Sequence, residues 1–200
     1  MSPRPDVSEE RKNQILEAAQ RLFSKLGFYQ ARMSDIAEES GLSKGTLYWY
    51  FKSKNDIILG LLDHIFESEL KDLQSLVEQE SPFAVKIEVY IDRIIDDMEH
   101  MVKWMPLAYD FISLAFRQET VQKAIRKYYQ AHMDILIPII EQGIEDGQLT
   151  VNAPEEAAIA IGALIEGTGV LWVYDPELID VRTHLRSNLH LLLKGLLDSS

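Results

Sequence analysis

Cysteine is absent from the 200-residue sequence. The chain can therefore form no disulfide, no thiolate metal site and no cysteine nucleophile. Its five histidines lack the spacing of a metal site, and the sequence contains neither a serine nucleophile motif nor a glycine-rich phosphate loop. We therefore expect no enzymatic activity and no bound cofactor or metal.

An apolar signal segment is also missing, because the N-terminal residues are polar and include two prolines. One stretch, residues 157–174, carries a single charge at Glu166 and reaches the lower length limit of a membrane span. Its four alanines, three glycines and near-central acid favour a buried or interface helix. We expect a cytoplasmic protein without a membrane partner.

Basic residues are few, and the formal net charge is −12. That total argues against a nucleic-acid partner, because phosphate repels an acidic protein. The charge is uneven, however: residues 1–54 hold nine Lys or Arg against seven acids, a net +2, and residues 55–200 carry −14. Screening limits charge effects to about 8 Å at physiological salt. The charge of the segment that would touch DNA therefore decides whether the chain can bind it, and the net charge of the whole chain does not. The shift predicts one domain at residues 1–54 and a second at residues 55–200.

Apolar residues recur at three- and four-residue spacing along most of the chain, and no strand-like alternation of any length occurs. Serines suited to helix caps and glycines suited to helix ends separate the periodic segments. We predict an all-α protein with nine helices, three in the first domain and six in the second. Their expected ranges are about 8–26, 34–40, 44–51, 53–77, 82–104, 106–118, 120–146, 154–174 and 180–197.

Residues 34–51 have the pattern of a helix-turn-helix, in which Gly41 permits a left-handed turn between two short helices. Ser43 can cap the second of these helices. Small, polar and basic residues at a helix N-terminus suit entry into the DNA major groove. Three consecutive aromatics on a short helix cannot all face a core, so some are exposed and available to DNA. The candidate DNA-binding residues of this segment are Ser43, Lys44, Gly45, Thr46, Tyr48, Trp49 and Tyr50.

These segments resemble the DNA-binding domain of the TetR family of transcriptional regulators over residues of about 8–60. The matching stretches are Gly27-Phe28, Asp35-Ile36-Ala37, Gly41 to Phe51 and Ser53 to Asp56. The resemblance implies that Lys44, Gly45, Thr46, Tyr48 and Trp49 lie at or near base edges, and that Tyr50 and Lys54 contact phosphates. We interpret Tyr48 as a DNA contact and Phe51 as a packing residue.

One position differs from the family's habit, in which a threonine or serine precedes the second helix and touches phosphate. Here Ala31-Arg32 occupies that place. Two alternatives remain open: Arg32 makes the phosphate contact, or Ser34 shifts the helix cap.

Methionines and aromatics concentrate between residues 98 and 133, which suits a tolerant small-molecule pocket, although an ordinary helical core has the same pattern. The resemblance implies a small-molecule effector, whose identity stays open. Asp110 or Glu99 would suit a cationic ligand or simply face solvent, and Glu166 would be a pocket acid or an interface group. The candidate ligand residues are Met98, Met101, Trp104, Met105, Tyr109, Phe116, Tyr129, Met133 and Glu166.

The last two predicted helices combine small residues on one face with a leucine stripe, a pattern suited to a four-helix interface between two subunits. The candidate interface residues are Ala158, Gly162, Ile165, Leu185, Leu189 and Leu192. A dimer would present two recognition helices to near-palindromic double-stranded operator DNA. We predict a homodimeric repressor that a small apolar or amphipathic ligand releases from its operator. The alternative is a constitutive DNA-binding or protein-interaction module without a ligand.

Overall fold

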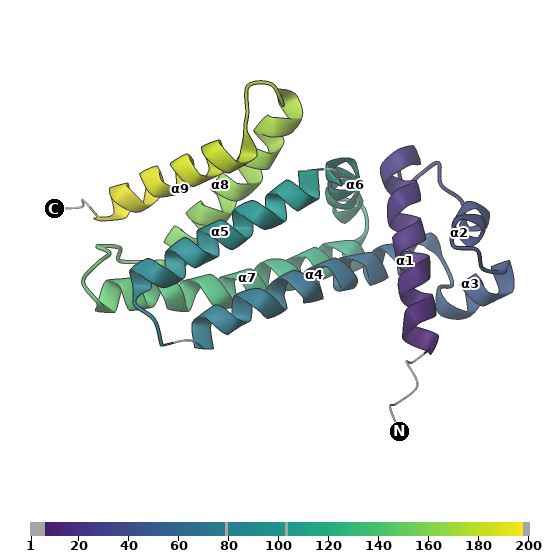
Figure 1. Ribbon diagram of the computed structural model, residues 1–200, viewed down its shortest axis with the longest axis horizontal. Coiled ribbons are helices and arrows are strands. Elements are labelled where there is room, and N and C mark those ends of the chain that lie inside the picture. The colour runs from purple at the N-terminus through teal and green to yellow at the C-terminus, as the bar shows by residue number, and fades with distance from the viewer. Residues whose placement is uncertain (1–6, 79, 103, 198–200) are drawn as a thin grey trace. The chain divides into compact units, whose positions relative to one another are not determined.

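The structure is a computed structural model that describes residues 7–78, 80–102 and 104–197. Within these ranges it contains helices and no strand, which confirms the predicted all-α class (Figure 1). The nine helices are α1 (Val7–Leu26), α2 (Met33–Glu39), α3 (Lys44–Tyr50), α4 (Lys54–Glu78), α5 (Phe83–Val102), α6 (Met105–Ala115), α7 (Glu119–Glu145), α8 (Pro154–Tyr174) and α9 (Val181–Leu197).

Two of the glycines predicted to end helices do so in the left-handed conformation. Gly27 follows α1 with φ +76°, and Gly41 follows α2 with φ +67°. A side chain with a Cβ is strained in this region of φ/ψ space, whereas glycine is not. Each glycine therefore lets the chain leave its helix and turn within a few residues.

The chain divides into two compact units. Unit 1 comprises the described residues of Met1–Phe66 and Trp104–Arg126, and unit 2 those of Glu67–Lys103 and Lys127–Ser200. The packing thus assigns α6 to the same unit as α1, α2 and α3, which differs from the predicted division after residue 54. The physical reason is apolar contact, since Leu107 and Phe111 of α6 belong to the buried cluster around Phe23 and Phe28.

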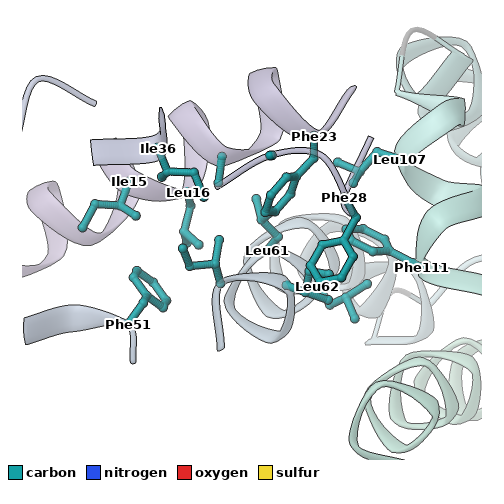
Figure 2. Packing of buried hydrophobic residues seen from close by; sticks show 14 of the residues in the cluster. Ile15, Leu16, Phe23, Phe28, Ile36, Phe51, Leu61, Leu62, Leu107 and Phe111 are labelled. Carbon is teal, nitrogen blue, oxygen red and sulfur yellow. The ribbon is translucent and has the colours of Figure 1, made fainter. Parts of the chain in front are cut away.

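The core of unit 1 is that single apolar cluster, which gathers residues far apart in the sequence (Figure 2). The rings of Phe23 and Phe28 meet edge to face, with centroids 5.6 Å apart. Gly60 lets α4 approach closely, because an added Cβ would lie 3.0 Å from Phe51 and 3.1 Å from Leu16. This rigid core positions the short helices α2 and α3.

Unit 2 is formed by α5, α8, α9 and the parts of α4 and α7 that belong to it, with α9 packed against both α5 and α8. Its interior includes Tyr90 and Ile95 of α5 and Leu185 of α9, each at most 2% exposed. On its surface, Arg182 of α9 binds the carboxylates of Asp96 and Glu99 at 2.6 Å each. This ion pairing fixes the register of α9 on α5 and is worth little in stability, because the charges are exposed.

Helix α8 has the length and composition to cross a membrane, with 21 residues and a mean hydropathy of 1.6 in its most apolar window. It meets that test alone among the helices of the described residues, and 28% of the window is buried inside the chain. A helix that packs in the core of a soluble protein passes the same test, so the composition of α8 is weak support for a span.

Candidate nucleic-acid interface

The helix-turn-helix consists of α2 and α3, joined by the turn at Gly41. The Oγ atom of Ser43 accepts hydrogen bonds from the backbone N–H of Thr46 at 3.1 Å, and the two side-chain hydroxyls lie 2.8 Å apart. This confirms the predicted cap at the start of α3. Ile36 of α2 and Leu47 of α3 are fully buried, so the two helices share one core.

Helix α1 fixes the C-terminal end of α2 through two side chains. The Nε2 atom of Gln14 donates to the carbonyl oxygen of Ser40 at 2.6 Å, and the Nε atom of Arg21 donates to Glu39 at 2.9 Å. Because the turn between α2 and α3 follows directly, these bonds hold α3 in a defined orientation within unit 1.

The outer face of α3 carries two rows of exposed residues at helical spacing. Lys44 and Tyr48 form one row and Gly45 and Trp49 the other, since residues four positions apart lie one above the other on a helix. Tyr48 is 45% exposed and Trp49 is 67% exposed. This face joins a cation, a backbone without a side chain and two aromatics, which together can contact phosphate, sugar and base edges. The individual DNA contacts stay a prediction.

The side chains that flank this face are partly or fully buried in unit 1. Thr46 and Tyr50 are half-buried, and the Tyr50 ring contacts that of Trp49 edge to face at 4.6 Å. Phe51 is 5% exposed and lies in the core of unit 1, as interpreted from the sequence. Trp49 is therefore the most exposed of the consecutive aromatics.

The predicted phosphate contact of Lys54 is wrong for its side chain. Its ammonium group donates to the carbonyl oxygens of Phe28 at 2.6 Å, Ala31 at 2.7 Å and Tyr29 at 3.3 Å. The nitrogen also lies 4.4 Å from the centroid of the Phe28 ring, and partial burial lowers the pKa of Lys54. An ammonium has three N–H donors, and these bonds use all of them. Lys54 instead ties α4 to the turn between α1 and α2.

Asp110 of α6 holds the same turn through another backbone group. Its Oδ2 atom accepts the backbone N–H of Phe28 at 2.8 Å, so this carboxylate is not the solvent-facing or cation-binding group considered from the sequence. The Phe28 residue is thus bound at its N–H by α6 and at its carbonyl by α4. No sequence pattern could reveal either contact, since the partners lie 82 and 26 residues apart.

Replacing Asp110 with alanine leaves the buried N–H of Phe28 without an acceptor. We expect a loss of about 1–3 kcal/mol in the free energy of unfolding, measured by urea denaturation. Asp110→Asn keeps an acceptor oxygen and should recover part of the loss. Asp134→Ala removes an exposed carboxylate on α7 and is the control; an equal stability of the Asp110→Ala and Asp134→Ala proteins would contradict the assignment.

The start of α2 resolves one of the alternatives left open at Arg32. Arg32 is the N-cap residue, and its backbone N–H donates to Oδ2 of Asp35 at 3.0 Å. Ser34 lies inside the helix and donates to Asp35 at 3.1 Å, so it does not shift the cap. The Arg32 side chain is exposed, and its contact with phosphate stays a prediction.

The start of α4 has a capping box formed by Ser53 and Asp56. The Oδ2 atom of Asp56 accepts the backbone N–H groups of Lys52 at 2.8 Å and Ser53 at 3.1 Å, and Ser53 Oγ accepts from Asp56 at 3.2 Å. The Nζ atom of Lys52 donates to the carbonyl oxygen of Tyr48 at 2.8 Å. Lys52 thereby caps the C-terminal end of α3 beside the exposed face.

The candidate ligand residues are divided between the two units. Trp104, Met105, Tyr109 and Phe116 belong to unit 1, and the other five, Met98, Met101, Tyr129, Met133 and Glu166, belong to unit 2. Met98 and Met105 are buried and Phe116 is 86% exposed. Phe116 has to be corrected, because a side chain at the solvent-exposed end of α6 does not line an enclosed pocket. Tyr129 and Glu166 are also exposed.

The structure has an open depression of about 350 Å³ at the connection between α8 and α9. Its described lining includes Glu99, Trp172 and Asp180 and none of the nine candidate ligand residues. Glu99 is already paired with Arg182 there. The residues that the structure describes contain no group of three His, Asp or Glu side chains placed to hold a metal ion.

Half of the candidate interface residues are inside unit 2. Ala158 and Leu185 are 0% exposed and Leu189 is 1% exposed, so a second chain could not cover them further. These three assignments have to be corrected: the leucine stripe of α9 packs inside its own chain. Gly162, Ile165 and Leu192 are half-buried. The outer surfaces of the same two helices expose Ile159 (53%) and Leu191 (64%), which the sequence pattern did not single out.

Two protein families match parts of the chain. The family described as "Bacterial regulatory proteins, tetR family" matches residues 15–61, and the family "BetI-type transcriptional repressor, C-terminal" matches residues 87–196. The first match contains α2 and α3, and the second covers more than half of the chain.

Individual relatives agree with both matches. The HTH-type transcriptional regulator YfiR of Bacillus subtilis is 27% identical over 205 residues, which cover 100% of this chain and 98% of that protein. A TetR transcription regulator from Haloarcula marismortui has the same fold, with a TM-score of 0.85, 18% identity and coverage of 95% and 100%. The regulator FadR of Bacillus subtilis in complex with stearoyl-CoA has a TM-score of 0.75, 24% identity and coverage of 92% and 98%.

Proposed function

The chain belongs to the TetR family of DNA-binding transcriptional regulators, which are not enzymes. From this membership we propose that the protein is a homodimeric repressor, and that a small apolar or amphipathic ligand releases it from its operator. The observation that carries the proposal is the exposed face of α3, which a capped start and a shared core hold in place. A DNA-binding role also places the protein in the cytoplasm.

In the proposed complex, α3 enters the major groove with Lys44, Gly45, Thr46, Tyr48 and Trp49 at or near base edges. Tyr50 and the exposed side chain of Arg32 contact phosphates. Two copies related by a two-fold axis would read half-sites one turn of DNA apart, about 34–36 Å. The net −14 of residues 55–200 would repel DNA outside the operator contacts, which limits non-specific binding.

The effector part of the proposal is supported by composition and by a relative. Unit 2 has buried or half-buried methionines at positions 98, 101 and 133, whose flexible side chains adapt to ligands of different shape. The FadR structure of Bacillus subtilis was solved with stearoyl-CoA, an amphipathic molecule. Release would be a population shift, in which the ligand favours a form of the dimer that does not match the operator spacing. Helices α4 and α7 contribute residues to both units and would carry the coupling.

The dimer contact we propose uses the outer surfaces of α8 and α9. The double variant Ile159→Glu with Leu191→Glu should give a monomer, because four charges would be buried in one symmetric interface. Sedimentation equilibrium measures the mass directly. Leu178→Glu changes a side chain that is 69% exposed in the connection between the helices and should leave the dimer intact. A dimeric double variant would contradict this choice of surface.

A gel-shift experiment with the DNA upstream of the protein's own gene tests the proposed function. We expect binding at low salt that a screened apolar or amphipathic ligand weakens. Absence of binding at low salt, with and without ligands, would overturn the proposal. Binding that no ligand changes, together with no rise in melting temperature during ligand screening, would favour the constitutive module instead.

A further inference from the structure

One buried polar atom of unit 2, the Nε2 atom of His132, has no hydrogen-bond partner among the residues that the structure describes. His132 of α7 is 8% exposed, and its Nε2 atom is buried without a hydrogen bond. The ring lies edge to face against that of Tyr128, one helical turn earlier, with centroids 4.5 Å apart. A buried polar atom without a partner destabilises a fold, so this nitrogen requires an explanation.

Two other polar side chains of unit 2, those of Thr168 and His100, are hydrogen-bonded. Thr168 is 2% exposed, and its hydroxyl donates to the carbonyl oxygen of Leu164 at 2.8 Å. His100 is exposed, and its Nδ1 atom is nevertheless hydrogen-bonded to the carbonyl oxygen of Asp96 at 2.7 Å. The buried imidazole of His132 therefore differs from both the other buried side chain and the exposed histidine.

The burial of His132 and of its neighbours on α7 indicates which chemical group could form the missing hydrogen bond with Nε2. Ile135, Leu136 and Ile139 follow on the same face of α7 and are at most 3% exposed. Burial lowers the pKa of His132 to about 4, so its imidazole is neutral at pH 7 and has one donor and one acceptor nitrogen. A neutral nitrogen in an apolar layer suits an uncharged hydroxyl, which can donate or accept. A carboxylate or ammonium group would lose its hydration there without an opposite charge.

From this we infer that Nε2 of His132 binds the hydroxyl group of an otherwise apolar effector inside unit 2. The inference rests on the proposed effector response and deepens it, since it names the chemical class of the ligand. The hydrogen bond that Nε2 lacks in the free protein forms when the effector binds, and the buried aliphatic side chains on the same face of α7 contact the effector's apolar body. His132 is then a specificity-determining residue that separates hydroxylated molecules from their hydroxyl-free parents.

Matched pairs of probes test the inference on the full chain. We would titrate 1-naphthol against naphthalene, and 4-hexylphenol against hexylbenzene, by calorimetry. The parent protein should bind the hydroxylated member of a pair about three- to tenfold more tightly, the range of a single hydrogen bond. His132→Phe and His132→Leu should bind both members equally. His132→Gln places an amide near the position of Nε2 and should keep part of the preference, and the control His100→Gln should keep all of it.

The possible results separate the inference from the function on which it rests. Equal binding of both members by the parent protein, or a hydroxyl preference that survives in His132→Phe and His132→Leu, would overturn the inference and leave the effector response standing. Equal binding by the parent protein is the result expected if a buried water already bonds to Nε2. Failure of every probe to bind the parent protein would overturn the inference as well. A gel shift on the same samples tests operator binding independently.

Discussion

Replacing Lys54 with alanine is expected to lower the free energy of unfolding by about 2–4 kcal/mol. The substitution removes one ammonium group and leaves three backbone carbonyls, those of Phe28, Tyr29 and Ala31, without that donor. Hydrogen bonds from a charged donor are stronger than neutral ones, and the contact with the Phe28 ring adds to the loss. The turn between α1 and α2 would loosen, so operator binding should fall together with stability.

A comparison of two lysines distinguishes this structural role from a phosphate contact. Lys44→Ala changes an exposed side chain on α3, so we expect unchanged stability in urea denaturation, weaker operator binding and a shallower dependence of binding on salt. Lys54→Met keeps an apolar stem of similar length and should be destabilised nearly as much as Lys54→Ala, because the ammonium is what the carbonyls lose. Normal stability of both Lys54 variants, combined with weakened binding, would restore the phosphate contact.

The difference between the correct and the incorrect predictions follows the sequence distance between partners. The caps at Ser43 and Asp56 were predictable, because each bonds groups three or four residues away and the motif is visible in the sequence. Lys54 and Asp110 bond to backbone groups 23 to 82 residues away, and any side chain can supply a backbone partner. Backbone partners leave no pattern of residue types, so only the folded structure reveals them.

Helix α9 shows a second limit of sequence patterns. Its leucines at helical spacing correctly predicted an amphipathic helix, but the buried face of Leu185 and Leu189 packs within the chain. Apolar residues at helical spacing predict that one face of a helix is buried. They do not indicate whether the same chain or a second chain buries it. The exposed Leu191, on the other side of the same helix, interrupts a polar surface and gives no periodic signal. The predicted interface leucines therefore belong to the core of their own chain, and a dimer surface on the outer sides of α8 and α9 stays a proposal.

Removing the Trp49 side chain is the second change for which we expect a large effect. Trp49→Ala should weaken operator binding about a hundredfold at fixed salt, since a contact worth about 1.4 kcal/mol is lost in each of the two half-sites that the proposed dimer binds. The indole is 67% exposed in unit 1, so its removal uncovers little of the core and stability should change by less than about 0.5 kcal/mol. An uncharged side chain releases no counterions, so the dependence of binding on salt should stay that of the parent.

Phe116→Ala is the matched control for Trp49→Ala, because it removes a still more exposed aromatic, 86% exposed, from the same unit. Both variants lose a large apolar surface side chain, so a general effect on solubility or folding would appear in both. A loss of operator affinity in Trp49→Ala alone would assign the effect to the face of α3. If Trp49→Ala binds the operator as tightly as Phe116→Ala does, the base contact must be made by Lys44 and Tyr48 without the indole, and the exposed row of Gly45 and Trp49 lies outside the groove.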